Sequence, residues 1–417
     1  MFFGIHASKI KFTRADARRL RKQHITEREP GPIVHDFDAL LNYVRGRRLR
    51  VTKSQQLLPL AFLAEINARL HHPVELGLQR PQQKSYPPIH GLYLLLRASG
   101  LTYLDETKTT AYLEVDEALA EEWDALNPTE RYGTLLETWL LRGAPEIVGE
   151  RARPFQRLPR NFEQWVGFFA RIPDDGVRPD TAEENVLDFL RYSPGWHNLG
   201  LLAPFGLIEI EHGAPLEGEG WQIAGIQRTP FGDALLALLY KSCFSDLDWV
   251  LELEEEEVVP PGTLQPVLAP YFPAWQRTLP LPQEDGFREG LYVFKVTLGK
   301  DVWRRLAIQA DSTFERLAHS IIDAYAFDHD HLYMLEYQSR RGTDRHLYHP
   351  YMDEGPWASD VLIGEAPLYL GQTLTFTYDF GDNWQFEVTL EEITRPEPEE
   401  TYPRVLEAQG EAPEQYP

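Results

Sequence analysis

The stretch that most constrains the fold runs from residue 373 to residue 390 and reads TLTFTYDFGDNWQFEVTL. Large apolar side chains alternate with polar ones on both sides of Gly381-Asp382-Asn383. This period of two predicts two strands that each have one buried and one solvated face. Gly and Asn reach positive φ at the least cost, so we expect the chain to reverse here with Gly381 at positive φ. The hairpin is expected to bury Tyr378, Phe380, Trp384 and Phe386.

The residues around this hairpin predict one domain, residues 286–395. Apolar side chains at helical spacing from Phe314 to Tyr325 predict a helix that faces a sheet, and Ser312 with Glu315 has the pattern of a capping box. Alternating patterns predict strands at residues 292–298, 302–308 and 331–338. The order β-β-α-β-β-β predicts an α+β roll, a mostly antiparallel sheet with one helix. Residues 396–417 are interpreted as a C-terminal tail.

Several motifs in this domain follow one another in a characteristic order. They are Trp303-Arg304-Arg305, the capped helix, Asp330-His331-Leu332-Tyr333 and Tyr378-Asp379-Phe380-Gly381-Asp382 with Trp384. Together they resemble the plasmid pRiA4b ORF-3-like domain family, whose members are also known as passenger proteins of certain insertion elements. The resemblance covers about a quarter of the chain. It implies the α+β roll and a link to mobile elements, but it implies no assigned biochemical activity.

Residues 33–148 have a mainly helical pattern. Helices are predicted at residues 37–44, 58–70 and 90–99, followed by short strands at residues 101–104 and 110–115. Three helices followed by a hairpin is the order of a winged helix, and this stretch resembles such modules. The second helix offers Glu65, Asn67 and Arg69 as polar groups, which are few for a helix that reads bases. We therefore favour a packing or protein-contact role over DNA reading.

Residues 149–245 fit a second winged-helix-like domain. Helices are predicted at residues 162–169, 184–192, 196–203 and 229–240, with strands at residues 206–210 and 221–227. The loop that would form the wing, residues 211–220, holds three glutamates and no Lys or Arg. Such a loop would repel phosphate.

Residues 246–285 differ in composition from what precedes them. They are acidic and rich in proline, but aromatic side chains such as Trp249, Tyr271 and Trp275 lie among the prolines. This segment is either a linker or an extended arm. We favour an ordered arm, because a solvated tether rarely contains aromatic residues.

The charge of the chain is unevenly distributed. Its formal net charge is −23, yet residues 1–53 hold 13 Lys and Arg against 5 Asp and Glu. Within the basic leader, residues 1–32, the candidate phosphate contacts are Arg18, Arg19, Arg21 and Lys22. A nucleic acid could bind there, but a merely solubilising leader is favoured because the rest of the chain would repel phosphate.

The candidate ligand or turn residues are His331, Asp379, Gly381, Asp382 and Trp384. Paired carboxylates could bind a cation or act in acid/base chemistry if they were held close together. Turn chemistry, with Asp side chains accepting from backbone amides around Gly381, is the favoured alternative. The other polar candidates in this domain are Asp328, His329, Asp330, His346 and His349.

The resemblance also bears on metal binding. Many members of the family carry a His-x-His pair after the helix and a third His in the last strand. Here these positions hold His331, Tyr333 and Phe386. A single imidazole is a poor site for a transition metal, so metal binding is left open. No catalytic residue is assigned, and no cofactor is expected.

Two classes of function fit these observations. The first is a non-enzymatic interaction or scaffold protein with a protein partner, linked to mobile elements or DNA transactions. The alternative is a metal-dependent phosphoryl-transfer or nuclease-type enzyme that uses the Asp and His residues of the C-terminal domain. The first is favoured because the spacing of these residues matches no tight ligand motif.

Hydropathy and cysteine content bear on where the protein works. No window approaches the roughly 18 unbroken apolar residues that a membrane span needs, and the start lacks a signal-peptide core. A cytoplasmic protein without membrane partners is therefore expected. The one cysteine, Cys243, is interpreted as a small core residue.

Overall fold

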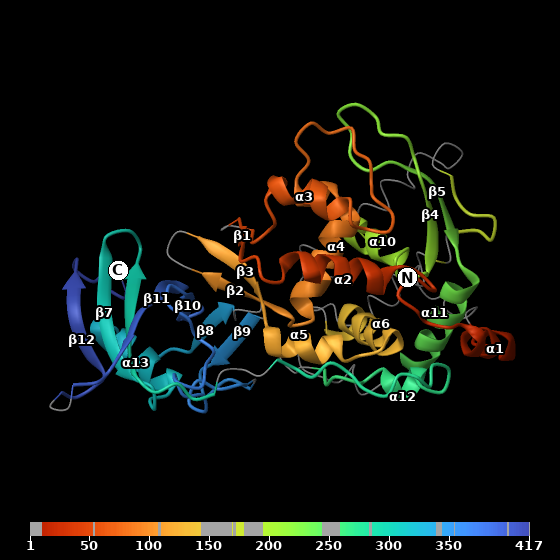
Figure 1. Cartoon of the computed structure of the whole chain (residues 1–417). Helices are drawn as coiled ribbons and strands as arrows, with labels where there is room; N and C mark the ends of the chain where they lie inside the picture. The colour runs from red at the N-terminus through yellow and green to blue at the C-terminus, as the bar shows by residue number, and fades with distance from the viewer. Residues whose placement is uncertain are drawn as a thin grey trace. The chain divides into compact units, whose positions relative to one another are not determined.

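The chain forms two compact units in a computed structural model (Figure 1). One unit comprises residues 1–103 and 112–282, and the other comprises residues 104–111 and 283–417. The predicted mixed α+β class is confirmed. The residues that the structure describes are 11–52, 55–106, 110–142, 169, 172–178, 195–243, 259–282, 286–338, 344–353, 355–397 and 400–416.

The C-terminal unit is built on a seven-stranded antiparallel sheet of order β12-β7-β6-β11-β10-β8-β9. Chain neighbours pair with one another in β6-β7, β8-β9 and β10-β11, whereas β6 also pairs with β11. The strands are β6 (Leu291–Leu298), β7 (Val302–Gln309), β8 (Tyr333–Gln338), β9 (Asp344–Tyr348), β10 (Thr373–Tyr378), β11 (Trp384–Thr394) and β12 (Arg404–Gln409).

The predicted hairpin is present as β10 and β11, with Phe376 opposite Phe386. Tyr378 and Phe386 are buried as expected. Phe380 is 46% exposed, so its predicted burial was wrong. The reason is Asp379, whose φ of 54° ends the strand and breaks the alternation before Phe380. Trp384 is partly buried and packs on the edge of the core.

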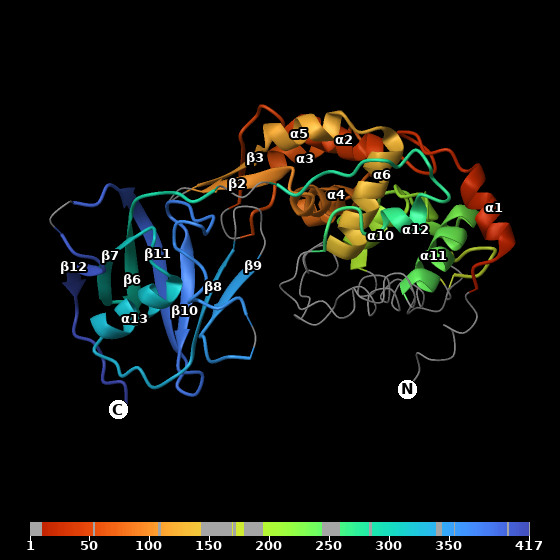
Figure 2. The same ribbon diagram turned by 90° about the horizontal axis from the view of Figure 1, so that it is seen from below.

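The predicted helix is α13 (Phe314–Ala324), which lies across the sheet (Figure 2). Its expected apolar stripe is buried in full, from Phe314 to the residue that follows the helix, Tyr325. The N-cap is Thr313, whose hydroxyl accepts from the backbone N–H of Arg316. The predicted capping box of Ser312 and Glu315 was therefore wrong by one residue.

Two strands of this sheet lie where the sequence suggested a loop and a tail. β9 pairs with β8, and β12 pairs with β7 at the edge of the sheet. All six residues of β12 are exposed, so no alternation of apolar and polar residues marks it as a strand. The chain after β12 is held by the buried Arg304, whose guanidinium donates to the carbonyls of Gln409 and Gly410.

The N-terminal unit is mainly helical. It also holds a three-stranded sheet of order β1-β3-β2 and the pair β4-β5. Its α-helices are α1 (Arg14–Lys22), α2 (Ile33–Val44), α3 (Leu60–Asn67), α4 (Pro87–Ala98), α5 (Glu117–Asp124), α6 (Pro128–Glu137), α10 (Trp196–Leu202), α11 (Pro230–Cys243) and α12 (Gln265–Leu268). Its strands are β1 (Leu49–Val51), β2 (Thr102–Glu106), β3 (Ala111–Val115), β4 (Ile208–His212) and β5 (Ile223–Arg228), although residues 104–106 of β2 and Ala111 of β3 belong to the stretch counted with the other unit. Short 3-10 and π turns lie at Gln83–Ser85 and Thr138–Arg142.

Many of the expected elements of this unit are present. The order α2, α3, α4 and then the hairpin β2-β3 agrees with the predicted series, whereas α1 and α5 were not predicted. The helices expected at residues 162–168 and 184–192 lie outside the described residues, as do the acidic run at 252–257 and the side chain of Cys243. None of the described helices combines the length and apolar character of a membrane span.

Helices α4 and α10 approach each other closely because each has a glycine at the contact. A Cβ at Gly91 would lie 2.6 Å from the carbonyl oxygen of His197, and one at Gly200 would lie 2.6 Å from the backbone of Pro87. Both gaps are too short for a side-chain carbon. Nine of the twelve residues of α4 are buried.

Residues 259–282 are the described part of the proline-rich arm, and they agree with the ordered alternative. Two buried glutamates on α6 hold them. Glu137 accepts from the backbone N–H groups of Gly262 and Leu264, each at 2.8 Å. Glu130 accepts from the N–H groups of residues 276 and 277. Between them, Gly133 leaves room for the ring of Trp275.

Candidate functional site

The polar candidates of the C-terminal unit meet at one end of strands β8 and β10. These strands are antiparallel neighbours, with Tyr378 opposite Tyr333. The backbone N–H of Asp379 also donates to the carbonyl of Leu332, at 3.0 Å. The turn after β10 therefore lies beside the loop that leads into β8, and this loop carries His331.

Asp379 is 7% exposed and uses its two carboxylate oxygens differently. Oδ1 accepts from the backbone N–H groups of Gly381, at 2.9 Å, and Asp382, at 3.4 Å. Oδ2 lies 3.4 Å from Nε2 of His331. The expected bond between an Asp side chain and the turn amides is confirmed. The same carboxylate also contacts the imidazole.

The conformation of the turn differs from the prediction. The residues at positive φ are Asp379 and Asn383, at 54° and 55°, and Gly381 is not among them. The prediction for Gly381 was wrong because Asp and Asn can also enter the left-handed region, where their side chains bond locally. Here Asp379 takes that conformation and caps the turn itself.

Asp382 and Trp384 do not join Asp379 at the imidazole. Asp382 is exposed and contributes its backbone N–H to the turn. The indole of Trp384 packs edge-on against Phe327, with ring centroids 5.1 Å apart. Its Nε1 is buried without a hydrogen-bond partner, so the contact is one of packing. The second carboxylate near His331 is that of Asp330, with 3.5 Å between Oδ1 and Nε2.

The end of the chain closes this cluster through Tyr416. Its hydroxyl lies 2.9 Å from Nε2 of His331 and donates to the carboxylate of Asp330, at 3.1 and 3.2 Å. The side chain of Gln415 donates to the same hydroxyl at 3.0 Å and accepts from the backbone N–H of Asp328 at 2.6 Å. Sequence reasoning missed both residues, because the segment has no periodic pattern. We call His331, Asp330, Asp379 and Tyr416 the His331 cluster.

Two tyrosines keep their protons at the His331 cluster: Tyr416, which belongs to it, and Tyr378, which contacts the backbone of His331. The pKa of Tyr416 is raised to about 12, first by desolvation of the hydroxyl and then by the adjacent Asp330. Burial also raises the pKa of Tyr378, whose hydroxyl bonds to the carbonyl of Asp328 and accepts from the N–H of His331. Both hydroxyls can therefore act as hydrogen-bond donors near neutral pH.

The remaining histidine candidates bond elsewhere. Nε2 of His329 contacts Asp323 at 2.7 Å, and Nε2 of His346 lies 3.4 Å from Glu336 on the neighbouring strand. The ring of His349 packs edge-on against Tyr333 at 4.6 Å, and burial lowers the pKa of this imidazole. Within the described ranges, no group of three or more His, Cys, Asp or Glu side chains is arranged to hold a metal ion.

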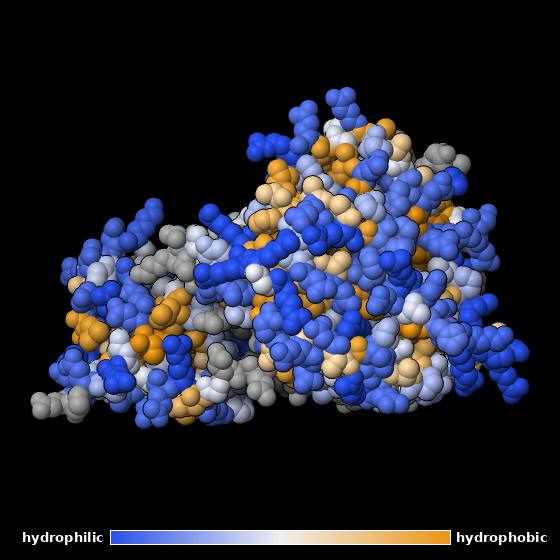
Figure 3. Space-filling model, in the orientation of Figure 1, coloured by the Kyte–Doolittle hydropathy of each residue, from blue (hydrophilic) through white to orange (hydrophobic). Residues whose placement is uncertain are grey.

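The predicted phosphate contacts lie on helix α1. Arg18, Arg19, Arg21 and Lys22 are all exposed, while Leu20 is buried between them. The helix packs against α11, and the surface over α1 is hydrophilic (Figure 3). The guanidinium of Arg21 lies over the ring of Tyr271, 5.2 Å from its centroid. This helix therefore presents a basic surface.

A second basic run, residues 45–53, lies after the leader, and three of its arginines have acidic partners. Arg45 contacts Glu117 and Asp124 at 2.8 and 2.7 Å, and Arg48 contacts Glu114 at 2.7 Å. Arg47 lies 3.7 Å from Glu65. Lys53, at the end of this run, lies outside the described residues.

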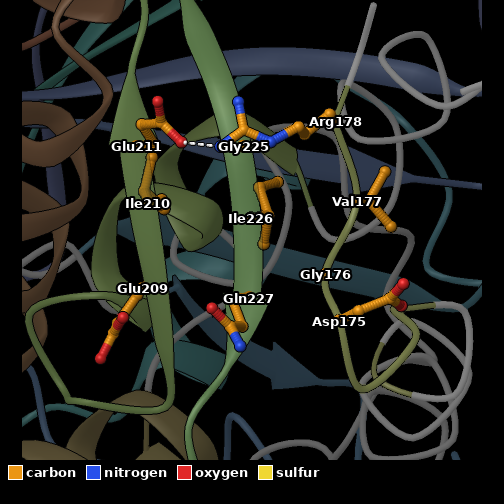
Figure 4. A pocket seen from close by; sticks show the side chains of 10 residues that line it. All are labelled: Asp175, Gly176, Val177, Arg178, Glu209, Ile210, Glu211, Gly225, Ile226 and Gln227. Atoms are coloured by element: carbon orange, nitrogen blue, oxygen red, sulfur yellow. Dashed lines mark hydrogen bonds and ion pairs between the residues drawn. The ribbon is translucent and has the colours of Figure 1, made fainter. Parts of the chain in front are cut away.

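A hollow of about 220 Å³ lies against β4 and β5 in the N-terminal unit (Figure 4). Residues 175–178 form its other side, and Val177 exchanges backbone hydrogen bonds with Ile226 at 2.8 and 2.9 Å. Its lining includes Asp175, Glu209 and Glu211, and the guanidinium of Arg178 bonds to Glu211 at 2.7 Å. This acidic lining is unsuited to phosphate.

Comparison with known proteins identifies the C-terminal region. Residues 291–415 match the model of the family described as plasmid pRiA4b ORF-3-like protein, which confirms the resemblance for this region. The match includes β12 and reaches Gln415. A crystal structure of a protein of unknown function from Methanosarcina mazei Go1 is 25% identical over 30% of this chain and 72% of that chain, with a TM-score of 0.27. No curated protein matched the chain.

Proposed function

We propose that the protein is a non-enzymatic interaction protein. The observation that carries this proposal is that the charged groups of the His331 cluster bond to one another and to the end of the same chain. These bonds join the turn after β10, the loop before β8 and residues 415–416, as in a contact site between protein segments.

The alternative is a metal-dependent phosphoryl-transfer or nuclease-type enzyme. Such an enzyme needs several carboxylate or imidazole groups that converge on a cation and leave coordination positions for the substrate. In this cluster, one oxygen of Asp379 accepts from the turn and the other faces His331. The Asp330 carboxylate accepts from Tyr416. These contacts favour the interaction class.

A metal titration followed by thermal unfolding distinguishes the two classes. We expect Mg²⁺, Mn²⁺ and Zn²⁺ to change the midpoint of the wild type and of Asp379→Asn by the same small amount. Asp382→Asn is the matched control, because that carboxylate lies outside the cluster. A saturable rise that is lost only in Asp379→Asn, together with metal-dependent hydrolysis of a phosphodiester, would contradict the proposal.

We further propose that α1 is the part of this interaction protein that can contact a polyanion, such as a nucleic acid. Four exposed basic residues on one short helix support this. Of these, Arg19 lies 4.0 Å from Asp16, whereas Arg45 and Arg48 of the second run bond to acidic partners at 2.7 to 2.8 Å. A link to mobile elements or DNA transactions would be consistent with such a contact. The unit also carries acidic residues, so binding should be weak and sensitive to salt.

Binding of a labelled DNA duplex at several salt concentrations tests this contact. Changing Arg18, Arg19, Arg21 and Lys22 to Ala should remove most of the binding and reduce the dependence of the affinity on salt. The matched control changes Arg45 and Arg48 to Ala, because these side chains are already paired. Equal losses in the two variants, or binding that does not depend on salt, would argue against a role for α1.

A further inference from the structure

The hydroxyl of Tyr416 is fully used by the groups around it. A tyrosine hydroxyl has one proton to donate and can accept two hydrogen bonds. Here it donates to the Asp330 carboxylate and accepts from the Gln415 side chain, and Nε2 of His331 lies 2.9 Å from it as its third polar neighbour. A phenylalanine ring could occupy the same place, but it would make none of these bonds.

The position of His331, which contacts this hydroxyl, is fixed by other parts of the C-terminal unit. The Oδ2 atom of Asp379 lies 3.4 Å from Nε2 of His331, and Oδ1 of the same residue is fixed by the turn amides. The backbone N–H of His331 donates to Tyr378, which is buried. His331 is therefore held in one place by groups that belong to the sheet and its loops, not by the end of the chain.

The segment that carries Tyr416 is weakly held by comparison. Residues 410–416 form no helix or strand, and Gln415 is the buried residue among them. The side chain of Tyr416 is 52% exposed even though its hydroxyl is bonded. Segments with few buried contacts open at low cost compared with the strands they lie on. Residues 410–416 are therefore held mainly by the bonds of Gln415 and Tyr416 and by Arg304 at Gly410, and less by burial than the strands are.

We propose that His331, Asp330 and Asp379 form a recognition site for a tyrosine hydroxyl, which Tyr416 occupies within its own chain and a tyrosine-bearing peptide occupies from outside. This inference rests on the proposed interaction function and names the class of partner for the His331 cluster. The end of the chain then acts as a competitor that limits access to the site.

The raised pKa of Tyr416 agrees with this arrangement, because the hydroxyl must keep its proton to donate to Asp330. A ligand with a carboxylate or phosphate at this point would face Asp330 and Asp379 and be repelled. The chemistry of the cluster therefore selects a neutral hydroxyl over an acidic group.

The test uses the full chain and two synthetic peptides. The first peptide has the sequence of residues 410–416, and the second is the same peptide with Phe in place of Tyr416. The double variant Gln415→Ala/Tyr416→Phe empties the cluster from within, and unchanged thermal unfolding shows that it is folded. We expect it to bind the tyrosine peptide about tenfold or more tightly than the wild type does. The phenylalanine peptide should bind it at least about tenfold more weakly.

A triple variant tests whether the peptide binds at the His331 cluster. Adding Asp330→Ala to the double variant should abolish the preference for the tyrosine peptide, because the carboxylate that accepts from the hydroxyl is gone. The single variant Tyr416→Phe should behave like the double variant to a smaller degree. Hydrogen exchange at residues 328–331 should be faster in both variants than in the wild type and slow again when the tyrosine peptide is added.

Two results would overturn this inference. Equal affinity for the two peptides would show that the hydroxyl is not recognised, and equal affinity of wild type and double variant would show that the segment does not compete. Neither result bears on the proposed function as a whole. The proposed interaction function would be contradicted by metal-dependent hydrolysis of a phosphodiester, whether or not the peptide binds.

Discussion

Two pairs of carboxylates, one in each unit, are held by the chain in different ways. Glu130 and Glu137 of the N-terminal unit are 2% and 1% exposed, and both accept from backbone N–H groups of the arm. Asp330 and Asp379 of the C-terminal unit lie beside an imidazole, and Asp330 accepts from the exposed Tyr416. The first pair fastens the backbone of the arm, whereas the second contacts side chains.

This difference indicates what each pair can do. Backbone N–H groups that lose a buried acceptor cannot be solvated easily, so such a contact favours permanent structure. Side chains on a loop and at the end of the chain can turn to water or to another molecule at little cost. Burial of an acidic group therefore does not mark a functional site by itself. The identity of its partners is the better guide.

The largest expected effect comes from the first pair. In Glu137→Ala, the N–H groups of Gly262 and Leu264 lose their acceptor. Because the site is buried, the free energy of unfolding of the N-terminal unit should fall by about 2 to 5 kcal/mol. Urea unfolding followed by tryptophan fluorescence measures the change, since the ring of Trp275, in the arm, packs against Gly133 of α6.

A control for this change is Glu122→Ala on helix α5. Glu122 is exposed, so its loss should alter the free energy of unfolding by less than about 0.5 kcal/mol. If Glu137→Ala were as mild as Glu122→Ala, the arm would be held by its apolar contacts alone. Glu130 and Glu137 would then not be needed to hold the backbone of the arm.

An intermediate effect is expected at Asp379, where two substitutions separate the turn from the cluster. Asp379→Ala removes the acceptor for the turn amides and places alanine at a φ of 54°, so it should cost about 1 to 3 kcal/mol. Asp379→Asn keeps an acceptor oxygen and tolerates this φ, so its cost should be below about 1 kcal/mol. Chemical denaturation of both variants gives these values, and equal losses would show that the turn does not depend on the acceptor.

The sequence predicted the centre of the C-terminal unit well for a physical reason. Strands such as β10 and β11 have one buried and one solvated face, and α13 buries one stripe, so their periodicities are visible in the residues. β12 is exposed at all six positions, and its pairing with β7 depends on backbone bonds that any sequence can make. It therefore has no periodic signal to detect.

The sequence predicted the separate parts of the candidate site but not that they meet. The motif around Asp379 and the loop with His331 were both identified, because turn-forming and polar residues stand out between strands. Their meeting at 3.4 Å depends on the pairing of β8 with β10, which a local pattern does not specify. Tyr416 lies 85 residues from His331 in the chain, so no spacing rule links the two.

A smaller effect is expected at Gly381. Unlike Asp379, this residue neither takes positive φ nor caps the turn with its side chain. Because Gly381 is outside the left-handed region, alanine meets no strain in φ. Its Cβ would lie 3.1 Å from Oδ1 of Asp379, so this carboxylate would have to move by a few tenths of an ångström within the turn. Gly381→Ala and Asp382→Asn should each change the free energy of unfolding by less than about 0.5 kcal/mol. A loss above about 1 kcal/mol in Gly381→Ala would restore the expectation that this position needs glycine.

The smallest expected effect concerns two imidazoles that the core of the C-terminal unit partly covers. Burial lowers the pKa of His319 and of His349, while the negative charge of Glu315 partly opposes this shift in both. The charges of His329, Asp323 and Arg316 also act on His319. Both rings pack edge-on against the buried Tyr333, whose hydroxyl has no hydrogen-bond partner.

The sign of the pH dependence follows from these shifts. Each imidazole has a lower pKa in the folded chain than the ordinary value of about 6.5, so below that pH the unfolded chain binds more protons. The stabilising contribution is therefore complete above about pH 6.5 and is lost as the pH falls through the folded pKa values. The double variant His319→Gln/His349→Gln should lose less stability between pH 7.5 and 5 than the wild type does. The control is His346→Gln, which removes the partner of Glu336. This control should leave the dependence of stability on pH as steep as in the wild type. Urea unfolding at a series of pH values measures it, and a slope unchanged in the double variant would mean that these two imidazoles titrate alike in the folded and unfolded chain.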